Sequence, residues 1–303
     1  MKTQISLSPI ILFVYNRPYH TKQTIEALKK NVLADSSDLI IYSDGPKTND
    51  KESFKVFEVR KYLKKITGFR SIKIIERKKN LGLAESIING VTSTLNKYDK
   101  IIVLEDDLVT SQYFLNFMND ALNSYVDDDD VCCIHGYSYP IKNINSDFFI
   151  KGADCWGWAT WKKAWNFFEK DSKKLLEELK RKNLHKDRYN LKCGYTKMLK
   201  DQIDGKNNSW AIRWYFSAYL NDLYCLYPKK SFVNNIGFDG SGTNCDQTNK
   251  YQNSINEDYN FNKEVYIFNK IDIVENEKVK LKIINFLKPE SFFLRLINFL
   301  KKL

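Results

Sequence analysis

Strand-like and helix-like patterns alternate through the first hundred residues. Apolar segments of strand length lie at 9–15, 38–43, 71–75 and 100–104. Between them, the apolar positions of 21–32, 52–65 and 83–95 recur with the period of a helix. Regular alternation of this kind predicts a mostly parallel, doubly wound sheet flanked by helices. We therefore expect an α/β, Rossmann-like fold.

The helical period also selects the side chains that should pack against the sheet. In the first helix these are Thr24, Ile25, Leu28 and Val32, and in the second they are Phe54, Phe57, Tyr62 and Ile66. The second half of the chain is less regular. Helices are predicted there at 113–125, 171–184 and 209–220, and a glycine-rich loop at 235–244. The four carboxylates of 127–130 follow no apolar strand, and we interpret them as a solvated turn.

Four tryptophans lie within residues 156–165. Trp161 and Trp165 are one helical turn apart in sequence, and we expect both in the core. Trp156 and Trp158 flank Gly157 in a predicted loop. Because the apolar face of a sugar ring packs well on indole, these two are either a stacking platform for a sugar or further core residues.

The positive charge of the chain is concentrated in two places. With 48 Lys and Arg against 37 Asp and Glu, the net charge is +11. Residues 51–80 carry a net charge of +8 and residues 278–303 carry +6, so the remainder is slightly acidic. Basic patches bind phosphate groups, which occur in nucleic acid, lipid headgroups and nucleotides. The sequence has no helix-turn-helix, zinc-finger or RNA-recognition signature, and we expect no nucleic-acid partner.

Cysteine usage and the chain ends indicate a cytoplasmic protein. The six cysteines include no CxxC pair and no zinc spacing, so we expect reduced, structural thiols. The first apolar run is short and ends in Asn-Arg-Pro, unlike a secretory signal. No run approaches the roughly 20 apolar residues of a membrane span.

Three adjacent carboxylates, Glu105, Asp106 and Asp107, stand at the end of an apolar strand. They repel one another and raise one another's pKa unless a cation holds them. Mg²⁺ or Mn²⁺, bound by one or two carboxylates and completed by diphosphate oxygens, is the natural occupant. Strand alternation places Glu105 and Asp107 on one side and Asp106 on the other. The alternative is an acidic corner without a ligand.

Polar residues also follow the other three strands. They are Asn16 and Arg17 after the first strand, Asp44 after the second, and Arg77, Asn80 and Gly82 after the third. Ligands of doubly wound sheets bind at the carboxyl ends of the strands. A carboxylate there can accept from a base N–H or a ribose hydroxyl, and an arginine can pair with phosphate. Residues 77–82 lead into a helix N-terminus, which suits a diphosphate.

The segments ILFVYNRP, SDG, NLGL and IVLEDDL, in this order and spacing, resemble the GT-A class of nucleotide-sugar glycosyltransferases. The likeness covers roughly residues 8–245 and is strongest to bacterial relatives of the N-acetylglucosaminyltransferase that begins complex N-glycan branching. It implies that Asp107 ligates the metal and that Glu105 and Asp106 contact its water shell or the donor. Arg17, Asp44, Asn80 and Gly82 would then surround the nucleotide.

The resemblance also assigns the second half of the chain. Trp156 and Trp158 match a loop beneath the donor sugar and acceptor. Residues 235–244, with Asp239 near the sugar or acceptor, match a flexible loop that closes over the diphosphate. In the family this loop can also supply a histidine ligand to the metal, where the present chain has Asn244. An Asn carbonyl is a weaker manganese ligand than imidazole.

The catalytic base is the least defined part of this assignment. The family often places an acidic residue directly after the tryptophan that matches Trp210, whereas this chain has Ala211. Asp204 and Asp154 are the remaining candidates for the group that deprotonates the acceptor hydroxyl.

The last residues have the pattern of a basic amphipathic helix. In 291–303, the polar residues Ser291, Arg295, Asn298 and Lys302 share one helical stripe, and the others are mostly aromatic or aliphatic. Such a helix can lie in a membrane interface and bind anionic lipid. The alternative is a helix packed on the domain or on a second subunit, and the sequence does not indicate the oligomeric state.

Together these patterns predict a metal-dependent glycosyltransferase on the inner face of the cell membrane. Its donor would be a nucleotide sugar, and its acceptor a saccharide or lipid-linked saccharide. The GT-A domain would span 1–275, with a nucleotide-binding half at 1–110 and an acceptor half at 111–275, followed by the tail at 276–303. Two rivals stay open. A sugar-phosphate nucleotidyltransferase would need a glycine-rich loop after the first strand, and a nucleic-acid-binding protein would use the basic segment 51–80.

Overall fold

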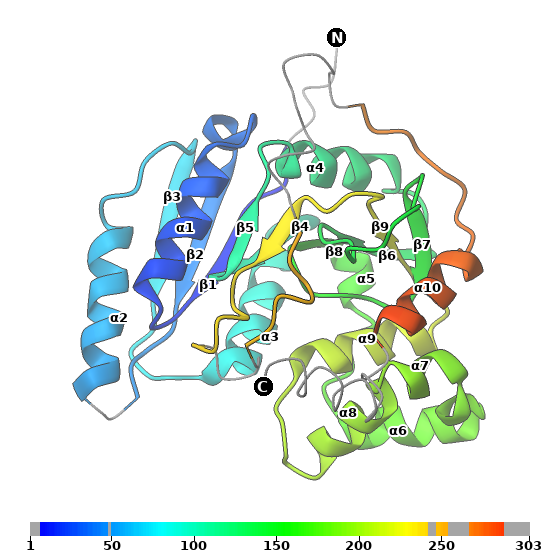
Figure 1. Cartoon of the computed structure of the whole chain (residues 1–303). Coiled ribbons are helices and arrows are strands. Elements are labelled where there is room, and N and C mark those ends of the chain that lie inside the picture. The colour runs from blue at the N-terminus through cyan, green and yellow to red at the C-terminus, as the bar shows by residue number, and fades with distance from the viewer. Residues whose placement is uncertain (1–6, 48–49, 242–246, 254–266, 288–303) are drawn as a thin grey trace, which may run out of the picture.

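The protein is described by a computed structural model that covers residues 7–47, 50–241, 247–253 and 267–287 (Figure 1). Its centre is an eight-stranded sheet with the order β3-β2-β1-β4-β8-β6-β9-β7. A second, two-stranded antiparallel sheet pairs β10 with β5. The strands are β1 Ile10–Val14, β2 Asp38–Ser43, β3 Ser71–Glu76, β4 Lys100–Glu105, β5 Leu108–Thr110, β6 Val131–His135, β7 Phe148–Lys151, β8 Trp158–Trp161, β9 Tyr224–Tyr227 and β10 Val233–Asn235.

The main sheet is mostly parallel, as the sequence predicted. β1 pairs in parallel with β2 and with β4, β2 pairs in parallel with β3, and β6 with β9. β8 and β7 run antiparallel to their neighbours. All residues of β1 are buried because helices cover both faces of the sheet at this point. This is why its sequence is continuously apolar rather than alternating.

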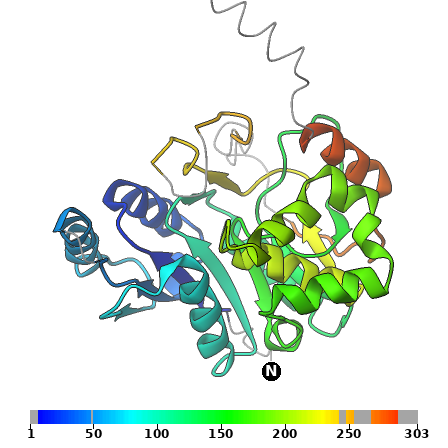
Figure 2. The same cartoon turned by 90° about the horizontal axis from the view of Figure 1, so that it is seen from below.

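Two layers of helices enclose the sheet (Figure 2). The helices are α1 Pro18–Lys29, α2 Asp50–Leu63, α3 Gly82–Leu95, α4 Phe114–Ser124, α5 Lys162–Trp165, α6 Ser172–Arg181, α7 Arg188–Lys192, α8 Tyr195–Ile203, α9 Trp210–Leu220 and α10 Glu277–Leu287. One hydrophobic core contains Leu28, Val59 and Phe114 and therefore lies beneath α1, α2 and α4. The other contains Ile87 of α3 and Trp214 of α9.

The predicted packing faces of the first two helices need correction. Thr24, Ile25 and Leu28 are buried as expected, but α1 ends at Lys29 and Val32 lies beyond it, 53% exposed. In α2 the buried side chains are Val56, Val59 and Leu63 rather than the phenylalanines. Phe54 and Phe57 are exposed, at 65% and 59%. Tyr62 and Ile66 do pack against the core beneath α2, as predicted, whereas the two phenylalanines lie on the outward face of the helix.

The chain beyond residue 275 returns to the body of the protein. α10 buries Val279, Ile283 and Ile284 in the core that also holds α3 and α9. Its approach is fixed by Glu275, whose carboxylate accepts a hydrogen bond from the Lys151 backbone N–H at 2.8 Å and pairs with the Lys280 ammonium at 2.6 Å. The helix predicted at 291–303 lies outside the described residues. Among the helices that the structure describes, none has the length and apolar character of a membrane span.

Candidate functional site

The topology creates a switch point at the carboxyl ends of β1 and β4. β1 is flanked by β2 on one side and by β4 on the other, and the connecting helices α1 and α3 lie on opposite faces of the sheet. At such a point the loops that follow the two strands diverge and leave a crevice where ligands bind. Arg17 follows β1, directly after Asn16, and Asp106 and Asp107 follow β4.

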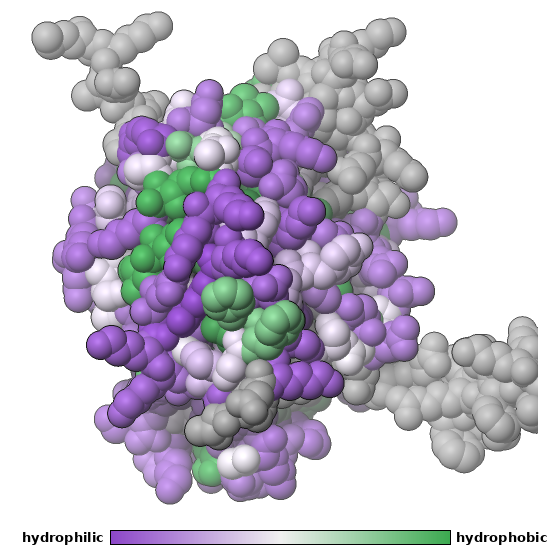
Figure 3. Space-filling view, turned by 90° about the vertical axis from the view of Figure 1, so that its left-hand side faces the viewer, coloured by the Kyte–Doolittle hydropathy of each residue, from purple (hydrophilic) through white to green (hydrophobic). Residues whose placement is uncertain are grey.

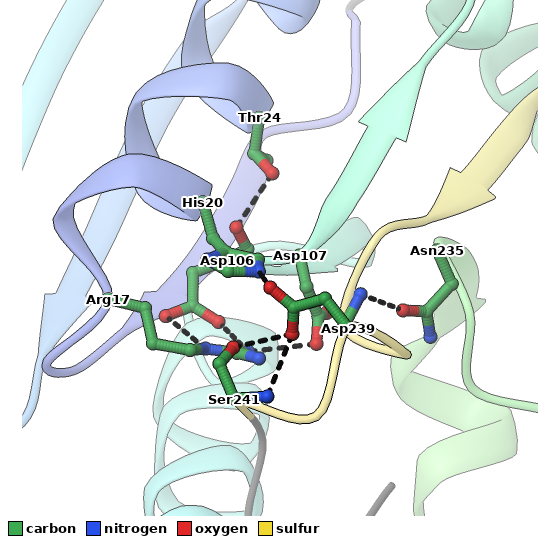
Figure 4. A network of polar contacts seen from close by, with 9 residues as sticks. Arg17, His20, Thr24, Asp106, Asp107, Asn235, Asp239 and Ser241 are labelled. Carbon is green, nitrogen blue, oxygen red and sulfur yellow. Dashed lines mark hydrogen bonds and ion pairs between the residues drawn. The ribbon is translucent and has the colours of Figure 1, made fainter. Parts of the chain in front are cut away.

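Arg17 holds both aspartates (Figure 4). Its Nη2 pairs with Asp106 Oδ1 and lies 2.8 Å from Asp107 Oδ2, and its Nε lies 3.4 Å from Asp106 Oδ2. Strand alternation had predicted that the two side chains point in opposite directions. That prediction is wrong because β4 ends at Glu105, and Asp106 and Asp107 form the turn into β5.

The electrostatics of this cluster are dominated by burial and close carboxylates. Burial, together with Asp107 and Asp106, raises the pKa of Glu105 to about 8. Burial also raises the pKa of Asp106, although Arg17 opposes the shift. Burial disfavours the charged form of Arg17, but Asp106 and Asp107 outweigh it and raise the guanidinium pKa. Arg17 therefore stays charged, and its guanidinium occupies the position at which the carboxylates attract a cation.

Helix α1 supplies two further contacts that the sequence analysis missed. Thr24 donates its hydroxyl to the Asp106 carbonyl at 2.8 Å, and His20 Nε2 lies 3.1 Å from Asp239 Oδ2. Both side chains are buried. Arg17, His20 and Thr24 stand three and four residues apart, so one face of the helix start points at the site. That spacing was visible in the sequence and could have identified them.

Residues 235–241, which we call the strap, cross the site from the opposite side. The Ile236 N–H donates to the Asp107 carbonyl at 2.9 Å. A Cβ added to Gly237 would overlap Asp107 Oδ2, so a larger residue would force either the strap or this carboxylate, which Arg17 holds, to move. Asp239 accepts hydrogen bonds from the backbone and hydroxyl of Ser241 at 2.9 and 2.6 Å. The predicted ligand Asn244 lies outside the described residues.

The residues predicted after β2 and β3 form a second cluster of their own. Asp44 is buried and accepts hydrogen bonds from the backbone N–H groups of Gly45, Leu81 and Gly82, at 3.0 to 3.1 Å. It therefore caps the N-terminus of α3. A carboxylate in this position opposes a second anion. That this helix end binds a diphosphate stays a prediction.

Asn80 and Arg77, the two other residues of this second cluster, also form contacts within the protein. Asn80 Nδ2 donates to the Gly45 carbonyl at 2.8 Å. Arg77 donates to the Ser86 hydroxyl and carbonyl and lies 5.3 Å from the centre of the Tyr42 ring. Their contact with a nucleotide stays a prediction, and the structure shows that they hold the ends of β2 and β3 together.

The four tryptophans divide into core and rim. Trp161 and Trp165 are buried, as predicted. Trp158 is also fully buried, and its ring contacts those of Trp165, Trp210 and Trp214. It has no face open to a sugar, so its role as a platform is excluded.

Trp156 is the tryptophan at the rim. It is half-buried, and its ring lies 5.4 Å from the ring of Phe238 in the strap and 4.7 Å from that of Tyr137. The indole thus connects the strap to the second half of the sheet.

The two candidate bases have different surroundings. Asp204 caps the end of α8, is exposed and pairs with Lys206 at 2.9 Å. Asp154 is only 20% exposed at its side chain and accepts a hydrogen bond from the Tyr227 hydroxyl at 3.1 Å. Burial raises the pKa of the thiol of its neighbour Cys155, and the charges of Asp154 and Glu105 add to the shift. Asp154 is therefore the better shielded of the two carboxylates and is held by a second polar side chain.

His135 fixes the segment that contains Asp154. Burial lowers the pKa of His135, so the ring is neutral at pH 7. Its Nε2 accepts a hydrogen bond from the Trp156 N–H at 3.0 Å and lies 3.7 Å from Asp154 Oδ1. A buried, neutral imidazole thus positions the chain between Asp154 and the rim tryptophan.

The carboxylate cluster fits one kind of metal site. Within the described residues, no group of three or more His, Cys, Asp or Glu side chains is arranged to hold a metal ion. Mg²⁺ in nucleotide sites, however, is bound by one or two carboxylates and completed by phosphate oxygens and water. Asp106 and Asp107, which already converge on one cationic group, match that smaller donor set.

Comparisons with known proteins give partial likenesses in fold. No protein-family model matches the chain, and no curated protein matches it in sequence. TarS of S. aureus aligns over 54% of this chain and 30% of its own, with 10% identity and a TM-score of 0.37. A structure of S. aureus TarS residues 1–349 aligns over 74% and 59%, with 12% identity and a TM-score of 0.39.

A third structure is that of the mannosyltransferase PcManGT from Pyrobaculum calidifontis in complex with GDP-Man and Mn²⁺. It aligns over 59% of this chain and 50% of its own, with 11% identity and a TM-score of 0.33. The chain thus spans less than two thirds of each of the three. Likeness at this level concerns the course of the chain and carries no argument about its chemistry.

Proposed function

We propose that the protein is a metal-dependent glycosyltransferase that uses a nucleotide-diphosphate sugar, with UDP as the nucleotide. The observation that carries the proposal is the convergence of Asp106 and Asp107 on Arg17 at the switch point of a mostly parallel sheet. This places two carboxylates and one guanidinium in the crevice where such sheets bind nucleotides. The acceptor is a saccharide or lipid-linked saccharide of surface polysaccharide synthesis, and transfer inverts the anomeric centre.

Asp107 and Asp106 would hold Mn²⁺ or Mg²⁺ together with the donor diphosphate. When bound, the ion stabilises the negative charge that develops on the leaving diphosphate. Arg17 is the group that must share its two carboxylates with the ion. Once released from one of them, its guanidinium can donate two parallel N–H···O hydrogen bonds to a phosphate group.

Asp154 is the better supported base. Its carboxylate is mostly shielded from water and lies beside the buried His135, whereas Asp204 is exposed and paired with a lysine. A base must lie within hydrogen-bond reach of the acceptor hydroxyl, and Asp154 stands two residues from the rim tryptophan Trp156. The Tyr227 hydroxyl orients its second oxygen.

The strap and Trp156 supply the contacts to the sugars. Phe238 of the strap touches Trp156, and Asp239 reaches back to His20 on α1. We assign these residues to the donor sugar and acceptor, with the indole face of Trp156 against a sugar ring. The localisation that goes with a lipid-linked acceptor is the inner face of the cell membrane.

The nucleotidyltransferase alternative is disfavoured by the start of α1. A triphosphate-binding loop after the first strand needs glycines and free backbone N–H groups. Here β1 is followed by Asn16 and Arg17, and Pro18, which has no N–H, opens the helix.

The test is a screen of nucleotide sugars for donor hydrolysis in the presence of Mn²⁺, followed by the Asp107→Asn variant. We expect hydrolysis of one UDP-sugar that depends on the metal and falls at least a hundredfold in the variant, because the ion loses a charged ligand. Asp129→Asn, which changes an exposed carboxylate, is the matched control. Unchanged turnover in Asp107→Asn refutes the proposal.

A second variant tests the assignment of the base. Asp154→Asn should abolish transfer to an acceptor while leaving UDP binding intact, whereas Asp204→Asn should behave as the wild type. The reverse result would move the base to Asp204.

A further inference from the structure

The outward face of α2 exposes two aromatic side chains. Phe54 and Phe57 lie one helical turn apart and are 65% and 59% exposed. Figure 3 shows this side of the molecule, where scattered apolar side chains stand among many hydrophilic ones. The opposite face of the helix is buried through Val56, Val59 and Leu63. The helix is therefore fixed in orientation, and the two rings are presented to the outside.

Lysines share this outward face with the rings. Lys61 continues the spacing of Phe54 and Phe57 along the helix, and Lys51 lies on the same side in its first turn. Lys64 and Lys65 follow in the turn directly after α2, where Lys64 also lies 3.6 Å from Glu76. All four lysines are exposed. The half-buried Glu58 is an acidic residue on the same face. The face is thus both apolar and strongly basic, in a helix whose other face is committed to the core.

We propose that the outward face of α2 is a docking surface for an anionic lipid bilayer. A bilayer supplies both an apolar layer for Phe54 and Phe57 and lipid phosphates for the lysines. The long alkyl stems of the lysines lie along the apolar layer while their ammonium groups reach the headgroups. A folded protein or a nucleic acid of negative charge could also pair with the lysines. The two protruding phenylalanine rings, however, favour the apolar interior of a bilayer as the partner.

The position of α2 connects this surface to the candidate site. The Tyr15 hydroxyl, two residues before Arg17, donates to Glu52 in the first turn of α2 at 3.2 Å. The same oxygen accepts from the Lys47 N–H at 3.4 Å. The start of α2 therefore lies beside the loop after β1. If the proposed function holds, docking through α2 brings the crevice close to a lipid-linked acceptor.

The test is co-flotation of the full chain with vesicles of phosphatidylglycerol and phosphatidylcholine, without any nucleotide. Binding should require the anionic lipid and weaken in high salt. Each lysine near an anionic surface strengthens binding about fivefold, so Lys61→Glu with Lys65→Glu should weaken it by more than tenfold. Phe54→Ser with Phe57→Ser should weaken it at least about tenfold as well, because the apolar contribution is lost.

The matched control is Lys173→Glu with Lys180→Glu on α6, an equal change of net charge on exposed residues of another helix. It should bind like the wild type, and all variants should keep the wild-type melting temperature. The proposal is overturned if the wild type does not bind the vesicles or binds them regardless of lipid charge. It is also overturned if all variants bind equally, or if the α6 variant loses as much binding as the α2 variants. The flotation assay contains no sugar donor or acceptor, so a negative result there does not bear on the transferase proposal. Likewise, a negative nucleotide-sugar screen does not bear on the docking surface.

Discussion

At the scale of single residues, the site depends on one guanidinium that pairs with two carboxylates. Arg17 is the cation that makes two adjacent, largely buried aspartates tolerable in the absence of a ligand. Removal of one partner from a buried pair leaves the other charge uncompensated, which costs more than the pair itself contributes. Single substitutions in this cluster should therefore change stability and ion binding together.

Arg17→Ala should destabilise the protein by about 3 kcal/mol, because Asp106 and Asp107 lose their counter-charge. Mn²⁺ should then raise the melting temperature of the variant more than that of the wild type, since it restores a positive charge. Thermal unfolding with and without the ion measures both effects. Arg17→Lys retains the charge and should fall between the two. If Mn²⁺ leaves the variant and the wild type equally unaffected, Asp106 and Asp107 do not bind the metal.

Gly237→Ala should destabilise the protein by about 1 to 3 kcal/mol, because the new Cβ would overlap the Asp107 oxygen that Arg17 holds. The backbone of Gly237 is not in the left-handed region, so the cost arises from the clash alone. Combined with Asp107→Ala, the same substitution should cost much less. A double-mutant cycle from chemical denaturation measures this coupling, and strictly additive effects would contradict the close approach.

At the scale of elements, the packing of each helix depends on which face the rest of the chain covers. The period of α2 was readable, but the choice between its phenylalanines and its valines was not, because both stripes are compatible with a helix. Likewise, the length of β4 decided the directions of Asp106 and Asp107. One residue more of strand would have turned one of them away from Arg17.

Glu275, which fixes the start of α10 to the body of the protein, gives a prediction with a defined pH dependence. Burial opposes ionisation of Glu275, but the bonds from Lys280 and the Lys151 N–H outweigh it and lower its pKa. A lowered carboxyl pKa contributes stability above the usual value near 4.5, and that contribution is lost as the pH falls through the folded pKa. Glu275→Gln should therefore reduce stability by about 1 to 2 kcal/mol at pH 7, with the difference from wild type shrinking below pH 4.

Melting curves between pH 3 and pH 7 test this dependence. Glu177→Gln, which removes an exposed carboxylate on α6, is the control and should follow the wild type throughout. A Glu275→Gln deficit that is constant with pH would show that the carboxylate is not the source of the stability.

At the scale of the whole molecule, residue 275 does not end the packed structure. α10 buries three aliphatic side chains in the core shared with α3 and α9. At about 1.5 to 3 kcal/mol for each buried side chain, its loss would remove on the order of 5 kcal/mol, much of the stability of an ordinary domain.

A chain that ends at residue 275 should therefore be far less stable than one that ends at Leu287. Denaturant unfolding of the two truncated chains measures the difference, and the longer one is the matched reference. Equal midpoints would show that α10 contributes nothing to the body and that the sequence-based boundary at 275 was a true domain end.

The sequence by itself determined the alternation of strands and helices, the mostly parallel sheet and the rim residues that follow β1 and β4. These are local properties, because continuous apolar runs and helical periods are written into adjacent residues. It also singled out Asp154, but it could not separate Asp154 from Asp204, since burial and hydrogen-bond partners arise only when distant segments meet.

Only the tertiary structure decided that Asp44 caps α3, that Trp158 lies in the core and that His20 joins the strap. Each of these depends on contacts between residues far apart in the chain, and side chains with similar local patterns acquire different roles once the sheet has selected which of them to cover. The packing of α2 also left Phe54 and Phe57 on the surface, where the two rings lie among lysines, as the proposed contact with a membrane requires.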